Sequence, residues 1–177
     1  MAEPKTFQKS ALVIGVLSTL ESHRADILST LQANFGPLEL ESPVMDFPFT
    51  DYYDAEMLAH PVRYLLLFRN LVDPSTLADL KLRTNALERT LSPTARRVNL
   101  DPGLLSLSSF ILATCKDRAH RIPLHSGIYA EVTLIYQSHS FQPLPWTYAD
   151  YRSPALLATL QTFRTRYRDL LRSATNC

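Results

Sequence analysis

The sequence predicts an α+β domain with a ferredoxin-like β-α-β-β-α-β order, additional antiparallel strands and a C-terminal helix. Two observations lead to this prediction. Short β-branched runs alternate with segments whose apolar residues recur every three or four positions, and a strand-rich stretch then precedes a long amphipathic helix. The 177 residues, 46% of them apolar and 20% charged, fit one domain over residues 1–177. Other α+β sandwiches share this order of elements.

The first elements are a buried strand, a helix and an edge strand. Residues 11–17 form a continuous β-branched run, which is typical of a central strand. A helix over residues 22–35 follows, and Gly36-Pro37 ends it. Residues 38–47 are extended but contain a proline, which favours an edge strand because proline cannot donate a hydrogen bond to a neighbouring strand.

A second strand and a second helix come next. Residues 62–71 form an apolar strand, and Asp73-Pro74 then supplies an N-cap with proline in the first helical position. Leucines recur at steps of three and four through residue 91, which predicts a helix to that point. A strand over residues 96–101 follows, and Pro102-Gly103 is expected to form a turn.

The remaining chain is predicted to hold one strand, a hairpin and a helix. The strand covers residues 110–116 and is expected to bury Cys115 as a free thiol. Residues 120–124 and 128–136 form the hairpin, which is closed through His125-Ser126-Gly127. Residues 154–173 form an amphipathic, arginine-rich helix.

One face of the predicted sheet is rich in charged and hydrogen-bonding side chains. Successive residues of a strand point to opposite faces, so every second residue of three strands falls on one face. The polar residues among them are Arg97, Asn99, Asp101, Thr114, Lys116, Tyr129, Glu131 and Thr133, and the apolar Phe110 and Leu112 share the same face. The helix that follows Asp73-Pro74 adds a stripe beside its leucines, made of Lys81, Asn85 and Glu88.

Two functions from different classes are compatible with this polar face. The first is a cleft for a small anionic ligand, phosphate-bearing or nucleotide-like, with or without enzymatic activity. Lys81, Arg97, Lys116 and Arg121 would contact anionic groups, with Asn85, Asn99, Thr114 and Thr133 as further ligand-binding residues. Glu88, Asp101 and Glu131 would orient the cations or hold Mg²⁺, and His120 with Glu131 would transfer protons. The second is a non-catalytic interaction or assembly module, in which the same charges form a structural network.

Several other classes are excluded or disfavoured. The net charge of +1 provides no field that would recruit nucleic acid or a membrane surface, and no apolar run approaches the roughly 18 residues of a membrane span. We therefore expect a cytoplasmic protein. With four glycines and no G-x-x-x-x-G-K-[ST] motif, a glycine-rich phosphate loop is excluded. The spacing of Asp117, His120 and His125 matches no standard metal site.

Two aromatic segments, residues 50–56 and 146–152, have two interpretations. The rings of either segment could stack on a ligand. Alternatively, the first segment could close one end of the core, and Trp146 of the second could anchor the C-terminal helix.

Several motifs spread over the chain resemble an uncharacterised prokaryotic family of proteins about this size. The runs that carry the resemblance are Phe47-Pro-Phe-Thr-Asp-Tyr-Tyr53, Lys81-x-x-Thr84-Asn85-x-x-Glu88, Arg97-Val-Asn-Leu-Asp-Pro-Gly103, Leu112-Ala-Thr-Cys-Lys-Asp117, His120-Arg121-Ile122, Gly127-Ile-Tyr-Ala-Glu-Val-Thr-Leu134 and Trp146-Thr-Tyr-x-Asp150-Tyr-Arg. The family is catalogued as a domain of unknown function, and some members carry an automatic GTP-binding label. This chain departs from the pattern at Pro123 and His125, both in the hairpin turn. The resembling residues coincide largely with the polar face.

Overall fold

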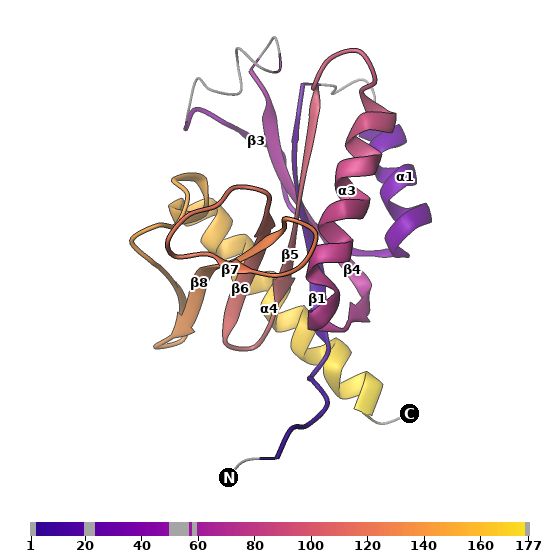
Figure 1. Ribbon diagram of the computed structural model, residues 1–177. Helices are drawn as coiled ribbons and strands as arrows, with labels where there is room; N and C mark the ends of the chain where they lie inside the picture. Colours follow the sequence, from indigo (N-terminus) through magenta and orange to yellow (C-terminus); the bar gives the residue numbers. More distant parts are fainter. Residues whose placement is uncertain (1–2, 20–23, 50–56, 58–59, 176–177) are drawn as a thin grey trace.

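The computed structural model describes residues 3–19, 24–49, 57 and 60–175 of the chain. Its helices are α1 (Arg24–Phe35), α3 (Leu77–Leu91) and α4 (Pro154–Thr175), and its 3-10 turns are η2 (Pro74–Thr76) and η3 (Asp150–Arg152). Its strands are β1 (Ser10–Ser18), β2 (Leu38–Glu41), β3 (Met45–Asp46), β4 (Val62–Val72), β5 (Val98–Leu105), β6 (Ser109–Thr114), β7 (Ile122–Pro123), β8 (Tyr129–Gln137) and β9 (Ser140–Pro143). The fold is mixed α+β, with the sheet between α1 and α3 on one side and α4 on the other (Figure 1).

The strands of the described residues form one antiparallel sheet of nine strands. Their order is β2-β4-β1-β5-β6-β8-β7, with β3 paired to β4 and β9 paired to β8. The continuous apolar run of β1 lies at the centre, between β4 and β5, as its sequence predicts. The edge strand predicted over residues 38–47 consists of two short strands, β2 and β3, which both pair with β4.

Both faces of the central strands are buried. On one face, β4 residues such as Tyr64 and Leu66 pack against α1, whose Ile27 belongs to the same cluster. On the opposite face, Leu65 packs in a second cluster with Leu160 of α4. The expected division into one apolar and one polar face is therefore wrong for the centre of the sheet, because the amphipathic α4 covers the second face. Among the described residues, no helix is both long and apolar enough to cross a membrane.

The entry to α3 follows the prediction. The side chain of Asp73 accepts a hydrogen bond from the backbone N–H of Ser75 at 2.8 Å, with Pro74 opening the 3-10 turn that precedes the helix. Leu77, Leu80 and other apolar residues of α3 then pack on the sheet. This cap fixes the start of the 3-10 turn that leads directly into α3.

The predicted turn at Pro102-Gly103 is wrong, because β5 continues through both residues. Pro102 pairs with β1, whereas pairing with β6 starts only at Gly103. Because β6 does not pair with residue 102, the missing N–H of proline costs no hydrogen bond to β6. Gly103 fits because the ring of Phe110 lies against it. A Cβ at this position would come within 2.6 Å of that ring.

The ends of β6 and β8 also differ from the prediction. β6 ends at Thr114, two residues early, so Cys115 is exposed and not buried in a strand. The hairpin of β7 and β8 is confirmed, and Ser126 and Gly127 both adopt positive φ in its turn. In β8 the register with β6 shifts at Thr133, a bulge that turns Leu134 toward α4 and not onto the face predicted for it.

Candidate functional site

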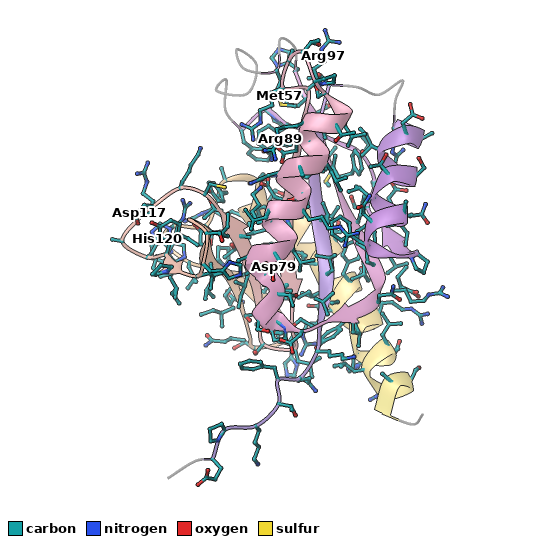
Figure 2. All side chains as sticks on the ribbon, turned by 45° about the vertical axis from the view of Figure 1, so that its right-hand side comes forward. Met57, Asp79, Arg89, Arg97, Asp117 and His120 are labelled. Atoms are coloured by element: carbon teal, nitrogen blue, oxygen red, sulfur yellow. The ribbon has the colours of Figure 1, made fainter. Side chains whose placement is uncertain are left out.

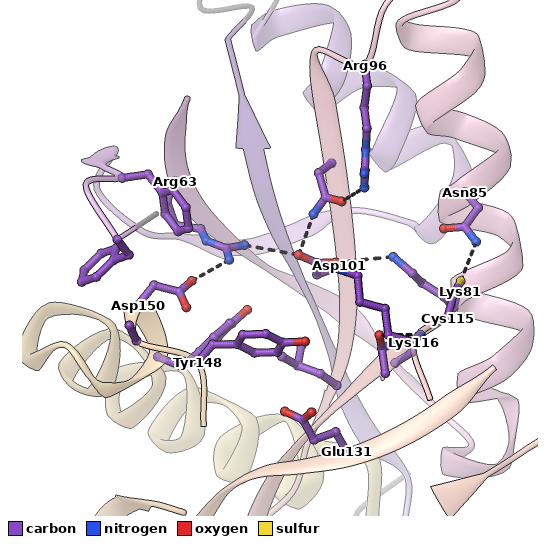
Figure 3. Close-up of a pocket in the computed structure, with 18 residues that line it drawn as sticks. Arg63, Lys81, Asn85, Arg96, Asp101, Cys115, Lys116, Glu131, Tyr148 and Asp150 are labelled. Carbon is purple, nitrogen blue, oxygen red and sulfur yellow. Dashed lines mark hydrogen bonds and ion pairs between the residues drawn. The ribbon is translucent and has the colours of Figure 1, made fainter. Parts of the chain in front are cut away.

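A pocket opens where β5 and β6 separate. The two strands pair only over residues 103–105 of β5 and 110–112 of β6. The first half of β5 therefore has only β1 as its neighbour, and the end of β6 has only β8. The space between them holds a pocket of about 490 Å³ (Figure 3). This volume lies in the range of small-molecule sites, roughly 300–1,000 Å³. Side chains from α3, β4, β5, β6, β8 and the segment around η3 line it.

Lys81 extends from α3 into this pocket and is itself 5% exposed. Its Nζ donates a hydrogen bond to the carbonyl oxygen of Leu100 at 2.8 Å and lies 3.4 Å from Oδ1 of Asp101. Glu88, two turns further along α3, accepts the backbone N–H of Leu100 at 2.7 Å and lies 4.0 Å from the same ammonium. Burial raises the pKa of Glu88 above its ordinary value, although the charge of Lys81 opposes this. Lys81 and Glu88 thus join α3 to the part of β5 that pairs with β1 but not with β6.

Asp101 is the carboxylate at which the cations of the pocket meet. Its Oδ2 accepts a hydrogen bond from Asn99 at 2.7 Å and lies 3.6 Å from NH1 of Arg63. Burial alone would raise the pKa of Asp101, but the charges of Lys81 and Arg63 outweigh burial and hold this pKa below its ordinary value. Asn99 in turn accepts a hydrogen bond from Arg96, so a connected polar network runs along this part of β5.

The inner end of the pocket is formed by Arg63 of β4 with Asp150 and Tyr151 of η3. NH2 of Arg63 donates to Oδ2 of Asp150 at 2.5 Å, and these two side chains are 6% and 4% exposed. Burial alone would lower the pKa of Arg63, yet Asp150 and the other acidic groups around it hold this pKa above its ordinary value. Among the described residues, Nε and NH1 of Arg63 and the hydroxyl of Tyr151 are buried without a hydrogen-bond partner.

Arg63 and Asp150 were not identified from the sequence. The available signal was an arginine directly before the apolar run of this strand, since a buried arginine requires an acidic partner. The partner lies 87 residues away, and no local pattern links the two.

Glu131 of β8 is the third carboxylate of the pocket and is 1% exposed. Its Oε2 accepts a hydrogen bond from Nε of Arg121 at 2.8 Å and lies 3.0 Å from Nε2 of His120. Arg121 also donates to the carbonyl oxygen of Lys116 at 2.7 Å and to the hydroxyl of Tyr148 at 2.6 Å. Arg121 therefore holds both the carboxylate and the chain that carries Lys116.

The exposed side of the pocket lies beyond the end of β6. Nδ2 of Asn85 in α3 donates a hydrogen bond to the sulfur of Cys115 at 3.5 Å, which links the helix to the segment that follows β6 (Figure 3). Thr114 accepts the backbone N–H of Lys116 at 3.2 Å, and Lys116 itself is exposed. This side of the pocket thus carries a cation that solvent can reach.

Seven of the twelve residues predicted for the site line this pocket. They are Lys81, Asn85, Asn99, Asp101, Thr114, Lys116 and Glu131.

The other five lie outside the pocket lining. Glu88, His120, Arg121 and Thr133 stand behind it, each contacting a residue of the lining. Arg97 is exposed and directly precedes the first residue of β5, whereas His120 lies on the loop before β7 (Figure 2). The expected alignment of Arg97 with Asn99 does not hold, because β5 begins only at residue 98 and Arg96 reaches Asn99 in its place.

Two further sequence questions have structural answers in part. No group of three or more His, Cys, Asp or Glu residues suited to a metal ion occurs in the part of the chain that the structure describes. The aromatic segment at residues 50–56 lies outside the described residues. In the second aromatic segment, Trp146 donates to the carbonyl oxygen of Val132 and stacks on His120, while Tyr148 lines the pocket.

Comparison with known proteins identifies a family and no function. A family model described as "Domain of unknown function (DUF4416)" matches residues 8–167. Searches of curated proteins and of solved structures returned no match. The matched range includes every residue of the pocket described above.

Proposed function

The chain belongs to the DUF4416 family, whose function is unknown, and we propose that its pocket binds a small anionic ligand that is phosphate-bearing or nucleotide-like. One observation carries the proposal. Four cationic side chains from four parts of the chain, Arg63, Lys81, Arg96 and Lys116, line one pocket of about 490 Å³. Cations converging in a concave site are typical of phosphate and carboxylate recognition.

The charge of the lining supports an anion over a cation. Among the described residues, four lysine or arginine side chains face three carboxylates, those of Asp101, Glu131 and Asp150. Each carboxylate is already in contact with a cationic side chain. A cationic ligand would have to displace one of these side chains. The cations are paired as well, since Arg96 lies 3.9 Å from Glu88, so an anion would bind by adding contacts to cations that already have acidic partners.

The predicted residues take two kinds of role in this proposal. Lys81, Asn85, Asn99, Thr114 and Lys116 would bind the ligand, and Asp101 would orient Lys81 or hold Mg²⁺ brought in with a phosphate. Glu131 is the acid–base group that lines the pocket. His120 contacts Glu131 and not the pocket, so it would act on a ligand through that carboxylate.

The position of the pocket follows from the architecture of the sheet. We interpret β2-β4-β1-β5 with α1 and α3 as a ferredoxin-like unit, to which β6 and β8 are added at the β5 edge. The pocket lies at this junction, where the added strands diverge from the unit.

A thermal-shift titration tests the proposal. Purified protein would be titrated with inorganic phosphate, pyrophosphate, and nucleoside mono- and triphosphates, each with and without Mg²⁺. We expect at least one of these anions to raise Tm. Lys116→Ala should weaken the binding of that anion at least tenfold, because the substitution removes a cation from the lining. Arg97→Ala is the matched control, since Arg97 is an exposed cation outside the pocket.

The outcome that contradicts the proposal is equally specific. If none of the anions raises Tm, or if Lys116→Ala and Arg97→Ala weaken binding equally, the pocket is not an anion site.

A second candidate function is a non-catalytic interaction module with a structural charge network. The pairing of Glu131 with Arg121 and of Arg63 with Asp150 favours it, because buried ion pairs of this kind also occur in purely structural networks. In that case Lys81→Met would change the free energy of unfolding, and none of the tested anions would alter Tm.

A further inference from the structure

We propose that the anionic ligand of the pocket also carries a planar aromatic ring, as a nucleobase does, and that this ring packs against the exposed rings of Tyr148 and Phe49. The inference rests on the proposed function and specifies the class of anion that the pocket takes. Two observations carry it. Both rings line the pocket with exposed surface, and each ring is held in position by contacts of its own.

The aromatic side chains of the pocket differ in exposure. Among the described residues of the lining, Phe47 and Tyr151 are 7% and 1% exposed, whereas Phe49 and Tyr148 are 40% and 43% exposed. Single exposed apolar side chains are common on protein surfaces, but those that line a concave site are typical of ligand-binding grooves. Because Phe49 and Tyr148 line the pocket, a bound molecule can cover part of their exposed surface.

Arg121 holds the ring of Tyr148. Its NH2 donates a hydrogen bond to the Tyr148 hydroxyl at 2.6 Å, and its guanidinium carbon lies 5.9 Å from the centroid of the ring. The side chain of Arg121 is itself 5% exposed and donates through Nε to Glu131 at 2.8 Å. The exposed ring of Tyr148 is thus tied to a buried ion pair of the pocket.

Phe47 holds the ring of Phe49. The two rings make an edge contact, with their centroids 5.5 Å apart and their planes at 65°. Phe47 is in turn buried, and its ring centroid lies 5.4 Å from the guanidinium carbon of Arg63. A ring that is already held in place loses little freedom when a ligand packs on it, which lowers the entropic cost of binding.

Arg121 also brings the aromatic contact next to a cation of the lining. Its NH1 donates to the carbonyl oxygen of Lys116 at 2.7 Å, while its NH2 donates to the hydroxyl of Tyr148. One guanidinium therefore joins the segment that carries Lys116 to the ring of Tyr148, and both residues line the same pocket. A molecule that combines an anionic group with a ring can contact both residues at once.

The size of the pocket favours such a molecule over a bare anion. Inorganic phosphate would occupy only a small part of about 490 Å³, a volume in the range of sites for larger organic ligands. Stacking of a base on an aromatic side chain is favourable for every base, because each base has a flat π face. Nucleoside monophosphates are therefore suitable probes of this ligand class.

The experiment compares AMP and GMP with ribose 5-phosphate, which keeps the sugar and the phosphate but lacks the base. Dissociation constants would be measured by calorimetry on the wild type and on four variants. Tyr148→Leu and Tyr148→Phe form one matched pair, because both lose the hydroxyl and only the first loses the ring. Phe49→Leu is matched by Phe7→Leu, since Phe7 is 65% exposed and lies outside the pocket lining.

We expect the wild type to bind AMP and GMP roughly tenfold more tightly than ribose 5-phosphate. This preference should fall to about threefold or less in Tyr148→Leu and in Phe49→Leu, because each substitution removes a ring on which the base packs. Tyr148→Phe should retain more of the preference than Tyr148→Leu, and Phe7→Leu should retain all of it. Because the two rings are replaced separately, each substitution tests the aromatic contact independently of the other.

The aromatic contact and the anion site fail in different ways. If ribose 5-phosphate binds as tightly as AMP and GMP, or if Tyr148→Leu and Phe49→Leu both keep the wild-type preference, the aromatic contact is refuted while the anion site stands. If AMP and GMP do not bind but inorganic phosphate or pyrophosphate raises Tm, the aromatic contact is again refuted alone. If none of these anions binds, both proposals are refuted.

Discussion

Replacing Asp150 with alanine should destabilise the protein strongly, because it leaves the charge of Arg63 buried without its closest partner. The two side chains are 4% and 6% exposed and are joined at 2.5 Å, while Asp101 lies 3.6 Å away and is shared with Lys81. Removing one partner of a buried ion pair costs about 3–5 kcal/mol. For a protein of about this size each kcal/mol shifts Tm by roughly 2–4 °C, so Tm should fall by about 6–20 °C.

Urea denaturation of four proteins measures this effect. They are the wild type, Asp150→Ala, Arg63→Met and the double variant, which together form a double-mutant cycle. We expect the double variant to be more stable than Asp150→Ala, because it no longer buries an uncompensated charge. A loss below about 1 kcal/mol for Asp150→Ala, or a double variant less stable than both single variants, would refute the reasoning.

Three further predictions concern other parts of the site. Gly15→Ala should lower the free energy of unfolding by about 1–3 kcal/mol in urea denaturation, because a Cβ there would lie within 2.9 Å of two buried side chains; an unchanged midpoint would show that these side chains can move aside. Asp101→Asn should be less stable than the wild type at neutral pH. Because the pKa of Asp101 is lowered in the folded state, its contribution is present above the ordinary value of 3.8 and is lost as pH falls below it, so the two unfolding midpoints should converge in acid and not in base. In a Cys177→Ser variant, Cys115 should react with a thiol reagent in the native protein at a rate near that of a free thiol; reaction only after unfolding would show that the thiol is covered.

Much of the fold follows from local sequence patterns. The β-branched run of β1 predicted a central strand, and Asp73-Pro74 predicted the start of the second helix, because strand burial and helix capping depend on neighbouring residues. The hairpin of β7 and β8 followed from its turn residues for the same reason.

The errors arose where a distant segment changes the meaning of a local pattern. Pro102-Gly103 has the composition of a turn, but Gly103 is required by the ring of Phe110 packed against it. Thr133 continues the alternation of β8 in sequence, but a register shift against β6 makes it a bulge. The contact of Gly103 with Phe110 and the register of β8 against β6 each join two different strands, and the periodicity of a single strand carries no information on such contacts.

The sequence alone predicts which side chains share the charged face. It does so through the two-residue period of the strands and through the spacing of Lys81, Asn85 and Glu88 along α3. The tertiary structure decided which of those side chains share a space. It excluded Arg97 and brought in Arg63 and Asp150, because a pocket is defined by where β5 and β6 diverge and by which helix covers the opening. Local periodicity assigns a side chain to a face, whereas the partner that it meets on that face depends on contacts between segments far apart in the chain.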